Sequence, residues 1–193
     1  SLACPWANRT LIMRNLKGLQ DFIPVTVVHW RMGKESWHFE AENGAEEDPL
    51  YHVKFLYELY RKVDPNYEEN GGVVTVPLLW DKKNNTVVSN ESAEIIRMFN
   101  SAFDQVGAIA GDYYPENLRQ EIDKMNDHFY SSINNGVYRC GFATSQEAYD
   151  IAYNELFGAL DYLENHLKGK HFLVADQLTE ADIRLFVRVS IFF

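Results

Sequence analysis

The sequence predicts an α/β domain followed by an all-α domain. Short β-branched runs alternate with helical patterns in the first hundred residues, whereas the chain after about Asp112 shows only helical periodicity and loops. Between these regions, the segment 107–115 contains two glycines and a proline, which is the composition of a linker. We therefore expect one domain at residues 1–106 and a second at residues 107–193.

Three helices are predicted in the α/β domain. The first covers residues 6–16, because Pro5 suits the first helical position and leaves Cys4 at the N-cap. The second follows Asp48-Pro49, where apolar residues recur at helical spacing. The third follows Asn90-Glu91-Ser92, whose side chains are suited to capping a helix start.

Three strands are predicted in the same domain. The β-branched run 24–30 indicates one strand, and the runs 74–80 and 86–88 indicate a hairpin around a polar turn. Pro77 lacks a backbone N–H, so it belongs at a sheet edge or a strand start. An extended peptide could pair with the backbone of Val76 just before it, and an ordinary strand start is the alternative.

A helix bundle is predicted for the second domain. Apolar residues form one helical stripe over 122–133 and a longer one over 148–167, behind a capping-box sequence that starts at Thr144. Thr179-Glu-Ala-Asp182 is a second start of the same kind. Since the chain opens beside the first helix and stops within an apolar helical pattern, we expect both ends to be truncated.

The overall composition is that of a folded protein that does not bind nucleic acid. Of the 193 residues, 46% are apolar and 24% are charged, with a formal net charge of −10. Binding to a phosphate backbone needs clustered Lys and Arg, which this balance disfavours. Two cysteines cannot build a disulfide framework, and no apolar run reaches the roughly 18 residues of a membrane span. These features predict a reducing, cytoplasmic location away from membranes.

Cys4 is the candidate nucleophile. The reactive form of cysteine is the thiolate, and the N–H groups and positive dipole end of a helix start favour it. The third residue after Cys4 is Ala7 rather than a second cysteine, so a resolving thiol must come from solution. The alternative is a small buried apolar residue, the common state of free cysteine. Cys140 lacks a helix-start setting, which predicts a passive residue.

Glu91, Ser92 and Tyr138 are further candidates. The N–H donors of a helix start and the Ser92 hydroxyl suit a carboxylate, and Glu91 suits an α-amino group, although an ordinary helix cap is the alternative. Tyr138 lies in a predicted loop and could supply a hydroxyl near the sulfur. The six histidines show no ligand spacing, which predicts the absence of a metal site.

This combination resembles the glutathione transferases. The features that carry the resemblance follow one another along the chain in this order: a helix-start thiol, a strand that begins with Val-Pro, a Glu-Ser helix start and a helical domain. The finer similarity is to the S-glutathionyl-hydroquinone reductases, the Omega-like Xi class. The segments that carry it are Ser1-Leu-Ala-Cys-Pro-Trp-Ala7, Thr75-Val-Pro-Leu-Leu-Trp-Asp-Lys82, Val88-Ser-Asn-Glu-Ser-Ala-Glu-Ile-Ile-Arg97, Asn134-Asn-Gly-Val-Tyr138, Gly141-Phe-Ala-Thr-Ser145 and Leu178-Thr-Glu-Ala-Asp-Ile-Arg184.

The resemblance implies a fold and a set of site residues. It implies a thioredoxin-like domain whose first strand is missing here, a truncated glutathione transferase-type helical domain, and a homodimer when full length. It assigns Cys4 as the nucleophile and places Tyr138 near a quinol oxygen. It also implies that glutathione, the co-substrate, is held by Trp37, Val76, Glu91 and Ser92.

The implied activity is the glutathione-dependent reduction of S-glutathionyl-hydroquinones through a mixed disulfide of Cys4 with glutathione, with release of oxidised glutathione. The alternatives are an Omega-like thiol transferase or dehydroascorbate reductase, and a non-catalytic glutathione-binding protein. Two residues depart from the family pattern: Asn8 replaces a histidine, and Val73 replaces an arginine that contacts glutathione. We expect Val73 to weaken the contact with the glutathione carboxylate. We also expect the missing first strand to destabilise the isolated chain.

Overall fold

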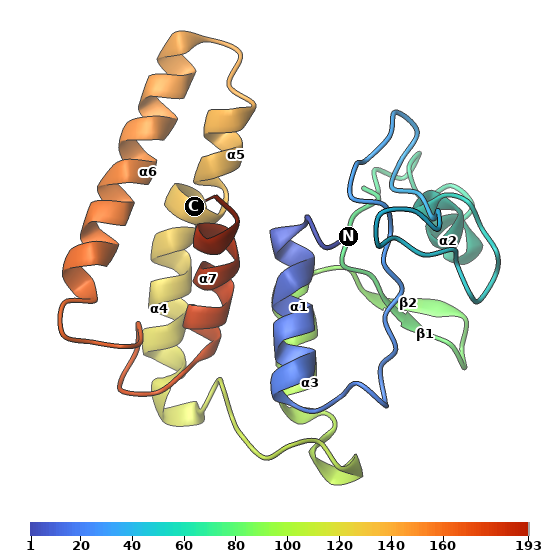
Figure 1. Ribbon diagram of the computed structural model, residues 1–193, viewed down its shortest axis with the longest axis horizontal. Helices are drawn as coiled ribbons and strands as arrows, with labels where there is room; N and C mark the ends of the chain where they lie inside the picture. Colours follow the sequence, from blue (N-terminus) through green and yellow to red (C-terminus); the bar gives the residue numbers. More distant parts are fainter. Residues whose placement is uncertain (193) are drawn as a thin grey trace. The chain divides into compact units, whose positions relative to one another are not determined.

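The computed structural model describes residues 1–192, which divide into two compact units (Figure 1). The first unit covers Ser1–Ala110, and the second begins at Gly111, inside the predicted linker segment 107–115. Helices and a small sheet make up the first unit, and helices alone make up the second. The predicted fold class, α/β followed by all-α, is confirmed. In the part of the chain described, no helix is both long and apolar enough to cross a membrane.

The first helix of the first unit, α1, covers Pro5–Leu16 and begins as predicted. Pro5 occupies the first helical turn and Cys4 is the N-cap residue. The helix ends before Gly18, whose φ of 63° is the left-handed conformation that favours glycine. The predicted helix after residues 90–92 is also confirmed as α3, Ser92–Ser101. In Figure 1, α1 and α3 lie side by side, and they pack against each other.

The second helix, α2, covers Leu56–Val63, so the predicted start at Asp48 was wrong. The Asp48 carboxylate accepts hydrogen bonds from three following backbone N–H groups and closes a tight turn instead. The helix begins only where the Glu58 carboxylate accepts from the N–H groups of Lys54 and Phe55.

The sheet contains two antiparallel strands in the described residues, β1 at Leu79–Asp81 and β2 at Thr86–Ser89. The predicted hairpin is therefore confirmed, but the predicted strand over 24–30 is wrong. That segment makes isolated backbone hydrogen bonds with the loop that follows it, such as the His29 N–H to the His38 carbonyl at 2.9 Å. Residues 74–78 also stay outside the ladder, since Pro77, which follows a cis bond from Val76, has no N–H to donate.

The apolar core of the first unit includes a cluster between α2 and the loops that precede it. Its buried members are Val28, Phe39, Leu56, Leu59 and Tyr60. The Tyr60 hydroxyl donates to the Thr75 carbonyl at 2.9 Å. This bond attaches α2 to the segment that leads to the Val76–Pro77 bond.

We expect the stability of the chain to fall above about pH 10 because of Tyr60. Burial raises the pKa of the Tyr60 phenol, and hydrogen bonds with Asn90 and Thr75 offset part of the rise. The unfolded chain then loses this proton at a lower pH than the folded chain. The stabilising contribution is therefore complete below about pH 10 and is lost as the pH rises through the folded value.

Urea unfolding at about pH 8 and about pH 10.5, on either side of the ordinary tyrosine pKa, tests this expectation. The free energy of unfolding should fall more in the wild-type chain than in Tyr60→Phe. Tyr57→Phe, on the same helix, is the matched control because it keeps the Tyr60 phenol. Equal losses in the wild type and in Tyr60→Phe would contradict the prediction.

The second unit is a helix bundle, as predicted (Figure 1). Its buried cluster includes Ile122, Phe129, Leu163 and Leu185. Short 3₁₀ turns at Asp104–Val106 and Glu116–Leu118 precede the bundle. Its elements are α4 at Arg119–Phe129, a π-type turn at Tyr130–Asn134, α5 at Gly136–Gly141, α6 at Gln146–His166 and α7 at Glu180–Phe192.

The starts of α6 and α7 follow capping rules, with one correction. The hydroxyl of Ser145, rather than of Thr144, accepts from the Ala148 N–H at 3.2 Å and caps α6. At the start of α7, the Asp182 carboxylate accepts from the Thr179 N–H at 2.9 Å and from its hydroxyl at 3.0 Å. The predicted capping sequence at Thr179 is thus confirmed.

Candidate active site

Cys4 lies at the start of α1 with its side chain directed toward the segment before β1. Its thiol donates to the Val76 carbonyl, with 3.6 Å between Sγ and the oxygen, and the residue is 8% exposed. Cys4 and Cys140 are both free cysteines. The structure therefore brings together two residues predicted from separate motifs, Cys4 and Val76, although they are 72 positions apart in the chain.

Asn8 holds the backbone around Cys4. Its side-chain amide donates to the Cys4 carbonyl at 3.2 Å and to the Leu2 carbonyl at 2.9 Å. These bonds close the turn that leads into α1. The asparagine found at this position in place of the family histidine thus has a structural role beside the thiol.

Glu91 and Ser92 form the start of α3. Glu91 is the N-cap residue, and its carboxylate oxygen Oε1 accepts from the Ala93 N–H at 3.0 Å. The Ser92 hydroxyl donates to the same oxygen at 3.3 Å, and Ser92 is 2% exposed. Glu91 itself is exposed. The helix start therefore combines an accessible carboxylate with a buried hydroxyl and N–H groups that point out of the helix.

Trp37 lies in the loop before α2. Its ring is half-buried against the cluster that contains Val28 and Tyr60, and its carbonyl accepts from the Leu56 N–H at 2.9 Å. In the part of the chain described, no hydrogen bond joins Trp37 to Cys4. The geometry gives Trp37 a packing role in the first unit.

Tyr138 belongs to the second unit and lies in α5, so the loop predicted for it was wrong. Helical hydrogen bonding continues through Asn135, whose N–H donates to the Tyr130 carbonyl at 2.8 Å. The Tyr138 ring stacks on Phe142, with 6.0 Å between the centroids. The guanidinium of Arg188, which is 2% exposed, lies 4.2 Å from the centroid of the Tyr138 ring.

Arg9 is a functional candidate that sequence reasoning missed. It lies on the buried face of α1, 1% exposed, and its Nη1 donates to the Ser92 hydroxyl oxygen at 3.4 Å. Its guanidinium also lies 4.4 Å from the centroid of the Trp6 ring. The available signal was a charged residue four positions before the apolar Met13 on the same helical face.

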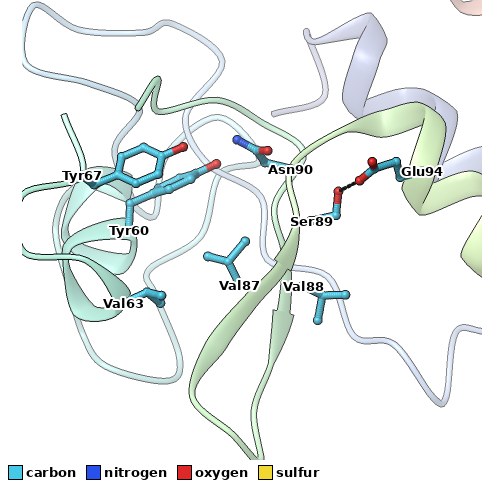
Figure 2. A pocket seen from close by; sticks show the side chains of 8 residues that line it. All are labelled: Tyr60, Val63, Tyr67, Val87, Val88, Ser89, Asn90 and Glu94. Atoms are coloured by element: carbon cyan, nitrogen blue, oxygen red, sulfur yellow. Dashed lines mark hydrogen bonds between the residues drawn. The ribbon is translucent and has the colours of Figure 1, made fainter. Parts of the chain in front are cut away.

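A cavity of about 330 Å³ lies between α2 and β2, and Figure 2 shows its walls. Tyr60 and Tyr67 form one side, and Ser89 donates its hydroxyl to Glu94 at 2.7 Å on the other. None of the six candidate site residues lines this cavity. The cavity lies beside the start of α3, because the Ser89 hydroxyl oxygen in its wall accepts from the Glu91 N–H at 3.0 Å. Among the residues described, no group of three or more His, Cys, Asp and Glu side chains is placed to hold a metal ion.

Two protein-family models match the chain. The N-terminal domain of glutathione S-transferase matches residues 3–102, and the C-terminal domain of the same family matches residues 146–188. The first match alone covers more than half of the chain. It includes Cys4, Trp37, Val76, Glu91 and Ser92.

Curated relatives and solved structures agree with these models. The chain is 59% identical to glutathionyl-hydroquinone reductase YqjG of Escherichia coli over 96% of its own length and 56% of the relative. It is 53% identical to glutathionyl-hydroquinone reductase PcpF of Sphingobium chlorophenolicum over 95% of its length and 58% of the relative. The chain thus spans less than two thirds of these two curated relatives.

Two solved structures have nearly the same backbone. The glutathione-bound structure of YqjG superimposes with a TM-score of 0.96 at 57% identity, over 100% of this chain and 62% of that one. Glutathione transferase Xi 1 from Trametes versicolor gives a TM-score of 0.95 at 54% identity, over 100% of this chain and 67% of that one. This chain belongs to the glutathione S-transferase family, and within that family it is similar to the Xi-class glutathionyl-hydroquinone reductases.

Proposed function

We propose that this chain catalyses the glutathione-dependent reduction of S-glutathionyl-hydroquinones, with Cys4 as the nucleophile. The observation that carries the proposal is the Cys4 thiol at the start of α1, with its Sγ 3.6 Å from the Val76 carbonyl. The Val76 backbone lies beside the sulfur, so a peptide that pairs with this backbone brings its own sulfur close to Cys4. The curated names of the two relatives support this choice of substrate class.

Residues 1–106 form the glutathione-binding domain in this proposal. Val76 pairs through its backbone with the cysteinyl unit of glutathione, and Trp37 forms part of the wall. Glu91 binds the α-amino group, because it is an exposed carboxylate, and Ser92 with the N–H groups of the helix start binds the α-carboxylate. The neighbouring structure of YqjG, described as glutathione-bound, supports this ligand.

The reaction proceeds in two displacement steps. The Cys4 thiolate attacks the sulfur of the substrate, so a disulfide bond forms and the bond between sulfur and the aromatic carbon breaks. The electron pair of that bond stays on the ring carbon, which takes a proton and leaves as the hydroquinone. A second glutathione thiolate then attacks the glutathione sulfur of the mixed disulfide, which releases oxidised glutathione and the Cys4 thiolate.

Tyr138 hydrogen-bonds to a ring oxygen of the quinol in this scheme. Residues 107–193, the second domain, supply this contact. The buried guanidinium of Arg188, 4.2 Å from the ring centroid, and the stacked Phe142 hold the Tyr138 ring in one orientation. A fixed hydroxyl favours a ligand whose oxygen lies at one defined place.

The remaining parts of the proposal concern the whole protein. We propose that it forms a homodimer in the cytoplasm and acts on aromatic glutathionyl-quinols without metal, membrane or nucleic acid. The family resemblance supports the dimer, and the composition and charge support the location. Size-exclusion chromatography with light scattering tests the dimer, since a monomeric mass would contradict it.

Turnover of glutathionyl-menadiol with added glutathione tests the proposed function. Release of menadiol with one oxidised glutathione per turnover is the expected result. If no menadiol is released but small mixed disulfides are reduced, the chain is an Omega-like thiol transferase that uses the same Cys4. If neither substrate reacts and glutathione still binds, the chain is a glutathione-binding protein.

A further inference from the structure

The second unit contains a cavity that the proposed reaction does not use. It has a volume of about 550 Å³ and lies among α4, α6 and the loop between α6 and α7. This volume falls within the usual range of small-molecule sites. None of the six candidate site residues lines this second cavity. The chemistry of its own lining therefore determines which ligand it fits.

One wall of the second cavity is a row of three rings. The centroid of the Tyr162 ring lies 4.7 Å from that of His128 and 5.9 Å from that of His166, whose plane is within 19° of the tyrosine plane. Nε2 of His166 lies 2.8 Å from the Leu173 carbonyl oxygen, and because a carbonyl only accepts, this nitrogen carries the proton. The Leu173 N–H donates in turn to the Asp182 carboxylate at 2.8 Å. These contacts hold the wall in place, so a planar aromatic ligand can pack against it.

Two lysines give the second cavity a positive charge. Lys124 of α4 and Lys170 of the loop after α6 both line it, and both are exposed. Within residues 1–192, neither ammonium group has a hydrogen-bond or ion-pair partner. Glu121 is the carboxylate of the lining, so two ammonium groups stand against one carboxylate, whereas the whole chain has a net charge of −10. The cavity therefore has the opposite sign to the chain and favours an anion.

We propose that this second cavity binds a planar aromatic anion, with its rings against Tyr162 and its anionic oxygens against Lys124 and Lys170. A fused pair of aromatic rings with one sulfonate or carboxylate group combines the two features. An aromatic cation would meet two like charges, and a small inorganic anion would leave the aromatic wall without a contact. The inference goes beyond the proposed function and does not depend on it.

The test compares 2-naphthalenesulfonate with 2-naphthalenesulfonamide, which has the same rings and is uncharged at neutral pH. Binding of each to the full chain is measured by isothermal titration calorimetry. The wild type should bind the sulfonate about fivefold or more tightly than the sulfonamide, because two exposed ion pairs contribute together. Saturating glutathione should change the Kd of the sulfonate by less than about twofold, because the two ligands occupy different places.

A pair of lysine substitutions tests the charge. With Lys124→Gln and Lys170→Gln combined, the preference for the sulfonate should fall to about twofold or less. The matched control combines Lys83→Gln with Lys168→Gln, which removes the same net charge from residues that do not line the second cavity. This control should keep the wild-type preference, because exposed charges act mainly over short distances in salt.

Substitutions of Tyr162 test the aromatic wall. The residue is 47% exposed, so its truncation should leave the fold intact, which circular dichroism checks. Tyr162→Ala should weaken the binding of both ligands about fivefold or more and leave the preference for the sulfonate unchanged. Tyr162→Phe keeps a ring and should bind both ligands within about twofold of the wild type.

Four results would overturn the inference. The first is equal binding of the sulfonate and the sulfonamide to the wild type, or binding of neither. The second is a preference that survives when Lys124 and Lys170 are both replaced, or that the control pair loses to the same extent. The third is displacement of the sulfonate by glutathione, which would place it at the thiol site. The fourth is unchanged binding of both ligands in Tyr162→Ala. A chain that binds the sulfonate as expected but does not turn over glutathionyl-menadiol would contradict the proposed function alone.

Discussion

Replacement of Cys4 by serine should lower the turnover of glutathionyl-menadiol at least about a thousandfold. A serine hydroxyl needs an adjacent base to become a nucleophile, whereas sulfur is intrinsically far more nucleophilic than a hydroxyl oxygen. The side chain is 8% exposed and serine is slightly smaller than cysteine, so the fold of the unit should be retained. Glutathione binding should therefore stay within about threefold, because the substitution leaves the binding groups in place.

Cys140→Ser is the matched control for this prediction. Cys140 is a partly buried residue of α5 in the second unit, without a helix-start setting, so its loss should leave turnover within about twofold. Mass spectrometry after reaction without added glutathione should find one glutathione on the wild type and on Cys140→Ser, and none on Cys4→Ser. Turnover by Cys4→Ser within tenfold of the wild type would contradict the assignment of the nucleophile.

Replacement of Ile122 by alanine should lower the free energy of unfolding by about 2–5 kcal/mol. Ile122 is fully buried in α4, in the same cluster as Phe129, Leu163 and Leu185. Loss of its side chain removes apolar contacts and leaves a cavity that close-packed neighbours fill only in part. Urea unfolding followed by far-ultraviolet circular dichroism gives the change directly.

Ile151→Ala is the control for the core substitution, because it makes the same chemical change on the surface. Ile151 lies in α6 and is 51% exposed, so its replacement should change the free energy of unfolding by less than about 0.5 kcal/mol. Equal effects of the two substitutions would show that the cluster around Ile122 does not stabilise the second unit.

Helix starts were predictable because capping is a local property. The proline after Cys4 and the side chains before residue 92 each act within one helical turn, and both helices begin where these residues place them. The strand predicted over 24–30 failed for the opposite reason. A β-branched run becomes a strand only when a partner strand lies beside it, and a pattern of residues does not identify that partner.

The sequence by itself determined the order of the two kinds of domain, the helix that begins after Cys4 and the chemical type of the candidate site residues. These features depend on residue spacing and on groups within a few positions of each other. Tertiary structure alone decided that Cys4 meets Val76, that Tyr138 lies in a helix, and that Arg9 is buried against Ser92. Each of these results depends on packing between segments that are distant in the chain, where burial and hydrogen-bond geometry outweigh local preference.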